Sequence, residues 1–210
     1  MKYMDQETKT QFSYNTIIIT GDYENIDIDT LCACEAYSVF LNMRGIQALH
    51  IQNPNLTQLQ ETVFNMCGIE LPSSQYIIKF NNKEFYGLIA IKPNSLKTLH
   101  PLATPQNTIG MISTFKPEYI DYLSEEDFKN YNTLQFEPVG SVSTLICEKF
   151  KLTNTPLSSN IASLLMIGII LNTNGLEEEQ THNRDFVAVQ YLEQFANIRK
   201  DQINALVNQL

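Results

Sequence analysis

The segment that most constrains the fold is a short apolar run at residues 16–20, closed by Gly21. Its sequence, Thr-Ile-Ile-Ile-Thr, is typical of a buried strand that ends at a turn. Residues 30–43 follow with apolar side chains at helical spacing, and Gly45 comes directly after them. Residues 46–52 have the pattern of a second strand. A strand, a helix and a strand in this order predict a right-handed βαβ unit with parallel strands.

The rest of the chain continues this alternation and then becomes helical. Residues 115–136 are acidic and aromatic, and we expect a loop there. Gly168 interrupts the most apolar of the predicted helices, which indicates close packing against a strand. We expect further strands at 75–80, 87–92 and 108–113, and further helices at 55–67, 141–151, 158–171, 184–197 and 201–210. The pattern predicts an α/β fold with a doubly wound, mostly parallel Rossmann-like sheet flanked by helices. Because no repeat or flexible linker is evident, we expect residues 1–210 to form a single domain.

The charge balance and the cysteines narrow the class of protein. Lys and Arg total 14 against 23 Asp and Glu, so the net charge is −9, which argues against non-specific binding to nucleic acid. No stretch reaches the ~20 apolar residues that a membrane-spanning helix needs. Residues 1–15 are polar, so we expect no secretory signal. The four cysteines, at positions 32, 34, 67 and 147, indicate reduced thiols in a cytoplasmic protein.

The acidic segment after the first predicted strand is a candidate site. It begins at Asp22 and ends with Asp27 and Asp29, which flank one residue just before a helix. Ligands of open α/β sheets bind beyond the carboxyl ends of the strands, and two carboxylates so spaced can share a divalent cation with water and phosphate oxygens. The same acids can instead serve as helix caps, with Asp29 or Thr30 accepting backbone N–H bonds. The local pattern favours capping.

Two stretches carry a family resemblance. Residues 17–48, which begin IIITGDYENIDIDTLCACEA, and residues 137–198, which begin EPVGSVSTLICEKFKL, resemble the family II (manganese-dependent) inorganic pyrophosphatases of the DHH phosphoesterase superfamily. The resemblance implies the N-terminal α/β lobe of these enzymes, a five-stranded, mostly parallel DHH-type sheet with helices on both sides. It also implies two manganese ions, held by His and Asp side chains at the strand ends, that activate water and clamp phosphate oxygens.

The family's metal ligands are only partly present in this chain. Asp27 and Asp29 match the two aspartates of the first motif, while Asp22 stands in place of its histidine. The family's last ligand aspartate is Asn172 here, a neutral and weaker ligand. Residues 88–91, where a bridging aspartate should end a strand, have no carboxylate, and residues 113–115 read Ser-Thr-Phe where two histidines should stand. The resemblance also leaves the basic C-terminal lobe, which grips the substrate, outside these 210 residues, and we expect it to be absent.

Three functions follow from these losses. The first is a degenerate, pyrophosphatase-like pseudoenzyme that needs no cofactor and acts as a binding or interaction module for a protein partner or a small ligand, with a homodimer possible by analogy. The alternative is a divergent pyrophosphatase or phosphoesterase in which Asp22, Asp27, Asp29 and Asn172 hold Mn²⁺ or Mg²⁺. The third is a regulatory subunit that binds a basic partner through the aromatic side chains of residues 115–136, which can equally form a lid. Gly140 and Ser141 start a helix and are the candidate anion or ligand cleft.

Overall fold

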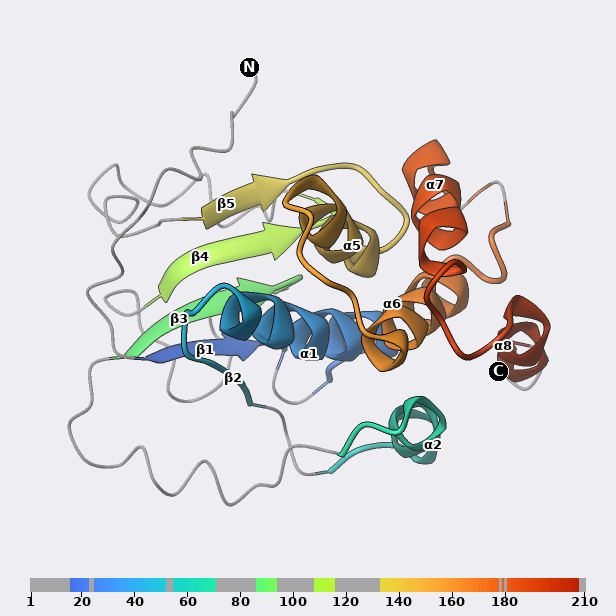
Figure 1. Ribbon diagram of the computed structural model, residues 1–210, viewed down its shortest axis with the longest axis horizontal. Helices are drawn as coiled ribbons and strands as arrows, with labels where there is room; N and C mark the ends of the chain where they lie inside the picture. Colours follow the sequence, from blue (N-terminus) through green and yellow to red (C-terminus); the bar gives the residue numbers. More distant parts are fainter. Residues whose placement is uncertain are drawn as a thin grey trace.

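The computed structural model describes residues 16–22, 25–51, 55–70, 86–93, 108–115, 133–177, 179 and 181–207. Strands and helices alternate in the first half and helices follow in the second (Figure 1). The strands are β1 (Thr16–Thr20), β2 (Ala48–His50), β3 (Tyr86–Ile91), β4 (Thr108–Ser113) and β5 (Thr133–Phe136). The helices are α1 (Ile28–Met43), α2 (Gln58–Cys67), α5 (Val142–Leu152), α6 (Ser159–Asn172), α7 (Asn183–Leu192) and α8 (Lys200–Val207).

The five strands form one sheet in the order β2-β1-β3-β4-β5, and every neighbouring pair is parallel. In the centre of the sheet, β1 pairs with β3 so that Ile18 faces Leu88. Because the strands are parallel, their carboxyl ends lie at one edge of the sheet. This arrangement confirms the predicted α/β class and the five-stranded sheet, and it brings the segments after β1, β3 and β4 close together.

Helix α6 is the centre of the helical layer. Helices α1 and α5 pack on the sheet, and α6 contacts both of them as well as α2, α7 and α8. In Figure 1, α6, α7 and α8 lie beyond the carboxyl ends of the strands. Every residue from Ile161 to Leu171 is buried, which explains why this helix is apolar on all sides. Gly168 faces the helices α5 and α1 through Ser143 and Cys32, so the predicted contact with a strand is wrong.

Several predicted boundaries differ from the structure. The second strand covers only 48–50 rather than 46–52, and the helix predicted at 184–197 ends at 192. The predicted loop at 115–136 ends in a strand, because residues 133–136 pair with β4. These four residues are only half-buried, so their own sequence carries little strand pattern. The strand predicted at 75–80 and residues 116–132 of the predicted loop lie outside the described residues.

The four cysteines are free and buried, as the sequence predicts for reduced thiols. Burial raises the pKa of Cys67 and of Cys147 from 9.0 to about 12. None of the described helices has the length and apolar character that a bilayer crossing requires.

We expect these thiols to make the protein less stable in alkali. Their pKa is raised on folding, so their stabilisation is complete below pH 9 and is lost as the pH rises towards about 12. At pH 10 each thiol should lower the free energy of unfolding by about 1.4 kcal/mol relative to pH 8. Urea unfolding of the wild type and of Cys147→Ala at both pH values measures this difference. Equal losses in the two proteins would contradict it.

Candidate functional site

A lysine and three oxygen-bearing side chains meet at the carboxyl edge of the sheet. Lys92 directly follows β3, and its Nζ lies 3.0 Å from Asp27 Oδ2, 3.4 Å from Asn172 Oδ1 and 3.8 Å from Asp29 Oδ2. Asp27 precedes α1, Asp29 belongs to its first turn, and Asn172 is the last residue of α6. We call these four residues the Lys92 cluster. It joins three of the side chains that the sequence predicted as metal ligands.

The backbone at Lys92 is unusual. Its φ of +46° lies in the left-handed region, which a lysine rarely adopts. The Lys92 N–H donates to the Ile112 carbonyl oxygen of the neighbouring strand at 2.7 Å, which fixes the chain at this point. Only 18% of the lysine side chain is exposed. Burial acts against its charged form, but the carboxylates of Asp29 and Asp27 outweigh this and raise the pKa of Lys92. The cluster therefore contains a fixed positive charge.

Asp29 anchors the start of α5. Its carboxylate is fully buried and accepts hydrogen bonds from Ser141 Oγ at 2.6 Å, Val142 N at 2.9 Å, Ser143 N at 3.0 Å and Ser143 Oγ at 2.7 Å. The unpaired N–H groups at a helix start favour an anion, and here the chain supplies its own. Burial is the main reason that the pKa of Asp29 is raised, and the charge of Lys92 acts in the opposite direction.

Asp27 serves as the N-terminal cap of α1. Its Oδ1 accepts from Thr30 N at 2.7 Å, which makes it the N-cap residue of α1. The acidic loop therefore caps the helix as predicted, but the capping residue is Asp27 and not Asp29 or Thr30. Asp27 caps α1, whereas Asp29 reaches across to α5.

The predicted anion cleft at Gly140 and Ser141 already has internal partners. Ser141 donates to Asp29, and Gly140 N donates to Asp185 Oδ2 at 2.8 Å. The Gly140 carbonyl oxygen accepts from Asn172 Nδ2 at 2.5 Å. Asp185 is fully buried and lies 45 residues from Gly140 in the chain, so no local pattern places it here. Two carboxylates of the chain itself therefore bind the segment where an external anion was predicted.

The other predicted positions lie outside the Lys92 cluster. Asp22 is buried two residues after β1, but the ion pairs of Lys92 with described residues are to Asp27 and Asp29. Ser113 ends β4 and is buried, and its hydroxyl oxygen accepts from Phe115 N at 3.5 Å. Sequence analysis overlooked Lys92. A charged residue at the end of an apolar strand was the signal that could have identified it.

The donor set does not fit a pair of divalent cations. The Lys92 cluster offers two carboxylates and one amide oxygen, and an ammonium group lies between them. Both carboxylates already accept hydrogen bonds from helix starts. Within the described ranges, no three His, Cys, Asp or Glu side chains come together as a metal-binding group. Hard cations bind oxygen ligands that are free to turn towards them, and a fixed ammonium opposes their approach.

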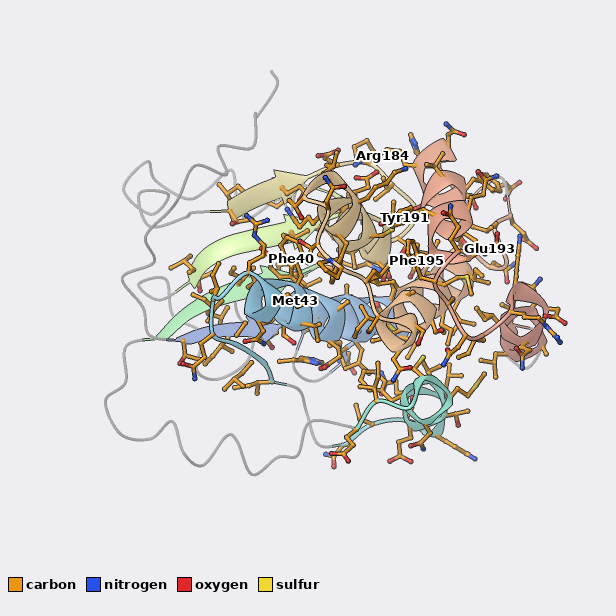
Figure 2. The ribbon with its side chains drawn as sticks, viewed as in Figure 1. Phe40, Met43, Arg184, Tyr191, Glu193 and Phe195 are labelled. Atoms are coloured by element: carbon orange, nitrogen blue, oxygen red, sulfur yellow. The ribbon has the colours of Figure 1, made fainter. Side chains whose placement is uncertain are left out.

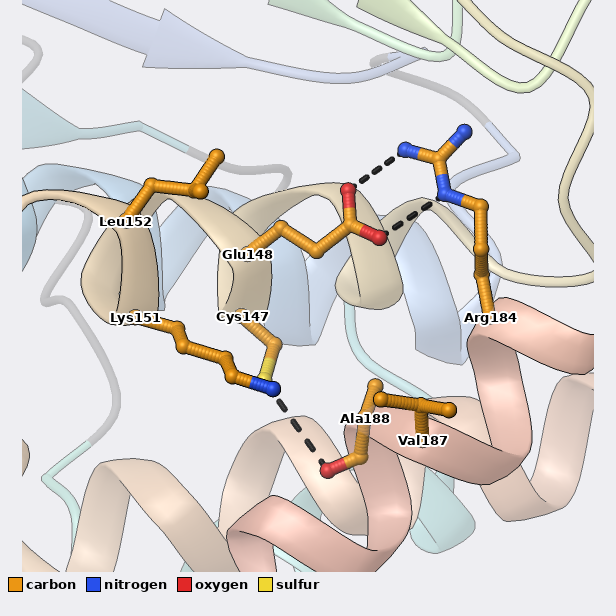
Figure 3. Close-up of a pocket in the computed structure, with 7 residues that line it drawn as sticks. All are labelled: Cys147, Glu148, Lys151, Leu152, Arg184, Val187 and Ala188. Atoms are coloured by element: carbon orange, nitrogen blue, oxygen red, sulfur yellow. Dashed lines mark hydrogen bonds and ion pairs between the residues drawn. The ribbon is translucent and has the colours of Figure 1, made fainter.

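A groove of about 290 Å³ lies elsewhere, between α5 and α7 (Figure 3). Arg184 forms a two-bond ion pair with Glu148 and a further ion pair with Glu137 at its border. Apolar side chains are exposed beside it: Leu152 is 76% exposed and Val187 is 44% exposed. Tyr191 near the end of α7 and Phe195, three residues after this helix, have ring centroids 5.1 Å apart (Figure 2). Among the described residues, none that lines this groove belongs to the Lys92 cluster. It is lined by Cys147, Glu148, Lys151, Leu152, Arg184, Val187 and Ala188.

The fold and the Lys92 cluster define a Rossmann-like α/β lobe with a lysine at the carboxyl edge of its sheet. No protein-family model matches the chain. The manganese-dependent inorganic pyrophosphatase of Bacillus subtilis is 23% identical over 189 residues, which cover 89% of this chain and 57% of that protein. A probable manganese-dependent inorganic pyrophosphatase of Lactobacillus delbrueckii subsp. bulgaricus is 25% identical over 179 residues, which cover 84% of this chain and 54% of that protein.

Solved structures show the same fold. A candidate family II inorganic pyrophosphatase of Methanococcus jannaschii superposes with a TM-score of 0.66 at 17% identity, over 92% of this chain and 59% of the other. An exopolyphosphatase-related protein of Bacteroides fragilis gives 0.66 at 16% identity, over 93% and 56%. The resemblance to family II pyrophosphatases read from the sequence is thus confirmed. The chain spans less than two thirds of the length of the relatives and structures that it matches.

Proposed function

We propose that this chain is a degenerate, pyrophosphatase-like domain that no longer catalyses hydrolysis with two metal ions and acts as a binding or interaction module. One observation carries the proposal. The two aspartates that match the family's first motif are committed to the fold, because Asp27 caps α1 and Asp29 accepts four hydrogen bonds at the start of α5. A carboxylate has about four lone-pair sites, so Asp29 has little left to offer a metal ion.

Exposed apolar side chains on α5 and α7 support the interaction part of the proposal. Leu152 and Val187 border the same groove, and ion pairs neutralise the charges of Arg184. Apolar groups gathered on a surface with neutralised charges are typical of places where proteins bind other molecules. We propose that the module binds a protein partner or a small ligand. The protein partner can be a second copy of the chain, which would form a homodimer.

The alternative function is a divergent Mn²⁺- or Mg²⁺-dependent pyrophosphatase or phosphoesterase. It is favoured by the similarity to manganese-dependent pyrophosphatases, which extends over 84–89% of the chain. This function would require Asp27, Asp29 and Asn172 to release their present hydrogen-bond donors and to bind a metal ion instead.

A hydrolysis assay separates the two functions. We expect the purified chain to release no phosphate above the enzyme-free blank from pyrophosphate or polyphosphate with Mn²⁺, Mg²⁺ or Co²⁺ present. The Bacillus subtilis enzyme, assayed in parallel, is the positive control. Metal-dependent phosphate release that disappears in Asp27→Asn would overturn the proposal and establish the alternative.

A further inference from the structure

We infer that Lys92 is a tethered cation: its ammonium takes, between Asp27, Asp29 and Asn172, the place that a free divalent cation would need. This inference rests on the proposed function and deepens it, because it names the group that replaces the metal. The distances of 3.0, 3.4 and 3.8 Å place one positive charge among oxygens from three different parts of the fold.

The charges of the cluster require such a cation. Asp29 is fully buried, and the negative charge of nearby Asp27 adds to the effect of burial in raising the pKa of Asp29. Two neighbouring carboxylates of which one is buried are costly without a counter-charge. Lys92 supplies that charge from within the chain, so the folded state depends on no ion from solution at this position.

The backbone gives a second, independent reason. A non-glycine residue at positive φ is strained and persists only where the surrounding structure holds it. Such residues are frequent at functional sites. Lys92 has a φ of +46° immediately after β3, and its N–H is held by the Ile112 carbonyl oxygen. This turn directs the lysine side chain to Asp27 and Asn172, where the ammonium binds.

Removal of the ammonium should therefore open a cation site. In Lys92→Ala, Asp27 Oδ2 and Asn172 Oδ1 lose the ammonium that now binds them, while Asp29 adds its negative charge from nearby. Hard divalent cations bind oxygen ligands of this kind. We expect Mn²⁺ to bind this variant about tenfold or more tighter than the wild type, because the repulsion by a charge a few ångströms away is gone. Binding should also raise the melting temperature of the variant in a saturable way.

The experiment titrates MnCl₂ into EDTA-treated protein and follows both free Mn²⁺ by electron paramagnetic resonance and the melting temperature. Lys92→Met, which keeps the length of the side chain, replaces Lys92→Ala if the smaller residue prevents folding. Lys151→Ala is the matched control, since Lys151 is an exposed lysine on α5 that lies over the ring of Tyr191. The double variant Lys92→Ala/Asp27→Asn should lose the gained affinity.

Each outcome decides the inference. Tighter Mn²⁺ binding in Lys92→Ala that the Asp27→Asn change abolishes supports it. Equal binding in the wild type and in Lys92→Ala or Lys92→Met overturns it, as does a gain that survives Asp27→Asn. These readings do not involve catalysis. Phosphate release by the wild type would overturn the proposed function, whereas an unresponsive Lys92 variant would overturn only the tethered cation.

Discussion

Replacing Asp29 with alanine should lower the free energy of unfolding by about 3–5 kcal/mol. The carboxylate is fully buried and accepts four hydrogen bonds from Ser141, Val142 and Ser143. Without it, Val142 N and Ser141 Oγ lose this acceptor, and Ser143 keeps only its longer bonds to Ser141 Oγ at 3.1 Å and to the Asp29 carbonyl oxygen at 3.3 Å. Lys92 also loses one of its two counter-charges. A buried donor without a partner costs about 1–3 kcal/mol, so several together give a loss of this size.

Urea unfolding followed by circular dichroism in the presence of EDTA measures this effect without any metal contribution. Asp27→Ala is the matched control, because Asp27 also caps a helix but 46% of its side chain is exposed. Loss of such a cap costs about 1 kcal/mol. Asp29→Asn should resemble Asp29→Ala, since its amide would place a donor against other donors. A loss no larger than that of Asp27→Ala would mean that Asp29 does not anchor α5.

The distinction matters for function as well as for stability. A residue kept only as a metal ligand contributes nothing to the metal-free protein, and its removal in EDTA leaves the free energy of unfolding unchanged or higher. A large loss of unfolding free energy in EDTA would show that the folded structure requires Asp29 even without a metal ion. Its match to a ligand motif would then be explained by packing of α1 against α5 and would carry no information about hydrolysis.

Local patterns were sufficient for most of the fold. The strand at 108–113 has the predicted bounds, and α1 begins two residues before the predicted start at 30, because the cap is Asp27 rather than a later residue. By contrast, β5 could not be predicted, since its four residues become a strand only through pairing with β4. Pairing between distant segments is a tertiary property that a short sequence window does not contain.

The candidate site was predicted only in part for a similar reason. Asp27, Asp29 and Asn172 were predicted together from the resemblance, and the structure brings all three to Lys92. The role of Lys92 depends on β1 and β3 being neighbours and on the end of α6 reaching them, and no local motif records this. Asp185 was missed because the atoms it binds at Gly140 come from a distant part of the chain.

The second large effect is expected at Gly168 in the buried helix α6. A Cβ there would lie 2.5 Å from Ser143 Oγ and 3.2 Å from Cys32 Cβ, so the Ser143 side chain, α5 or α1 must shift to admit it. Alanine gains about 1 kcal/mol over glycine in helix propensity. Overpacking costs about 1–3 kcal/mol, and displacement of the Ser143 hydroxyl from Asp29 costs about 1–2 kcal/mol more. We therefore expect Gly168→Ala to be destabilising by about 1–4 kcal/mol, and Gly168→Val to lose more.

A double-mutant cycle with Ser143→Ala tests the cause of this loss. Ser143→Ala removes the oxygen that the new methyl group would meet and also removes the hydrogen bond that its displacement would break. The loss in Gly168→Ala/Ser143→Ala should therefore be smaller than the sum of the two single losses by about 1 kcal/mol or more. Additive losses would place the strain at Cys32 on α1 instead. A positive coupling would show that α6 packs against the same hydroxyl that binds the Asp29 carboxylate, so that the helical layer and the Lys92 cluster are stabilised together.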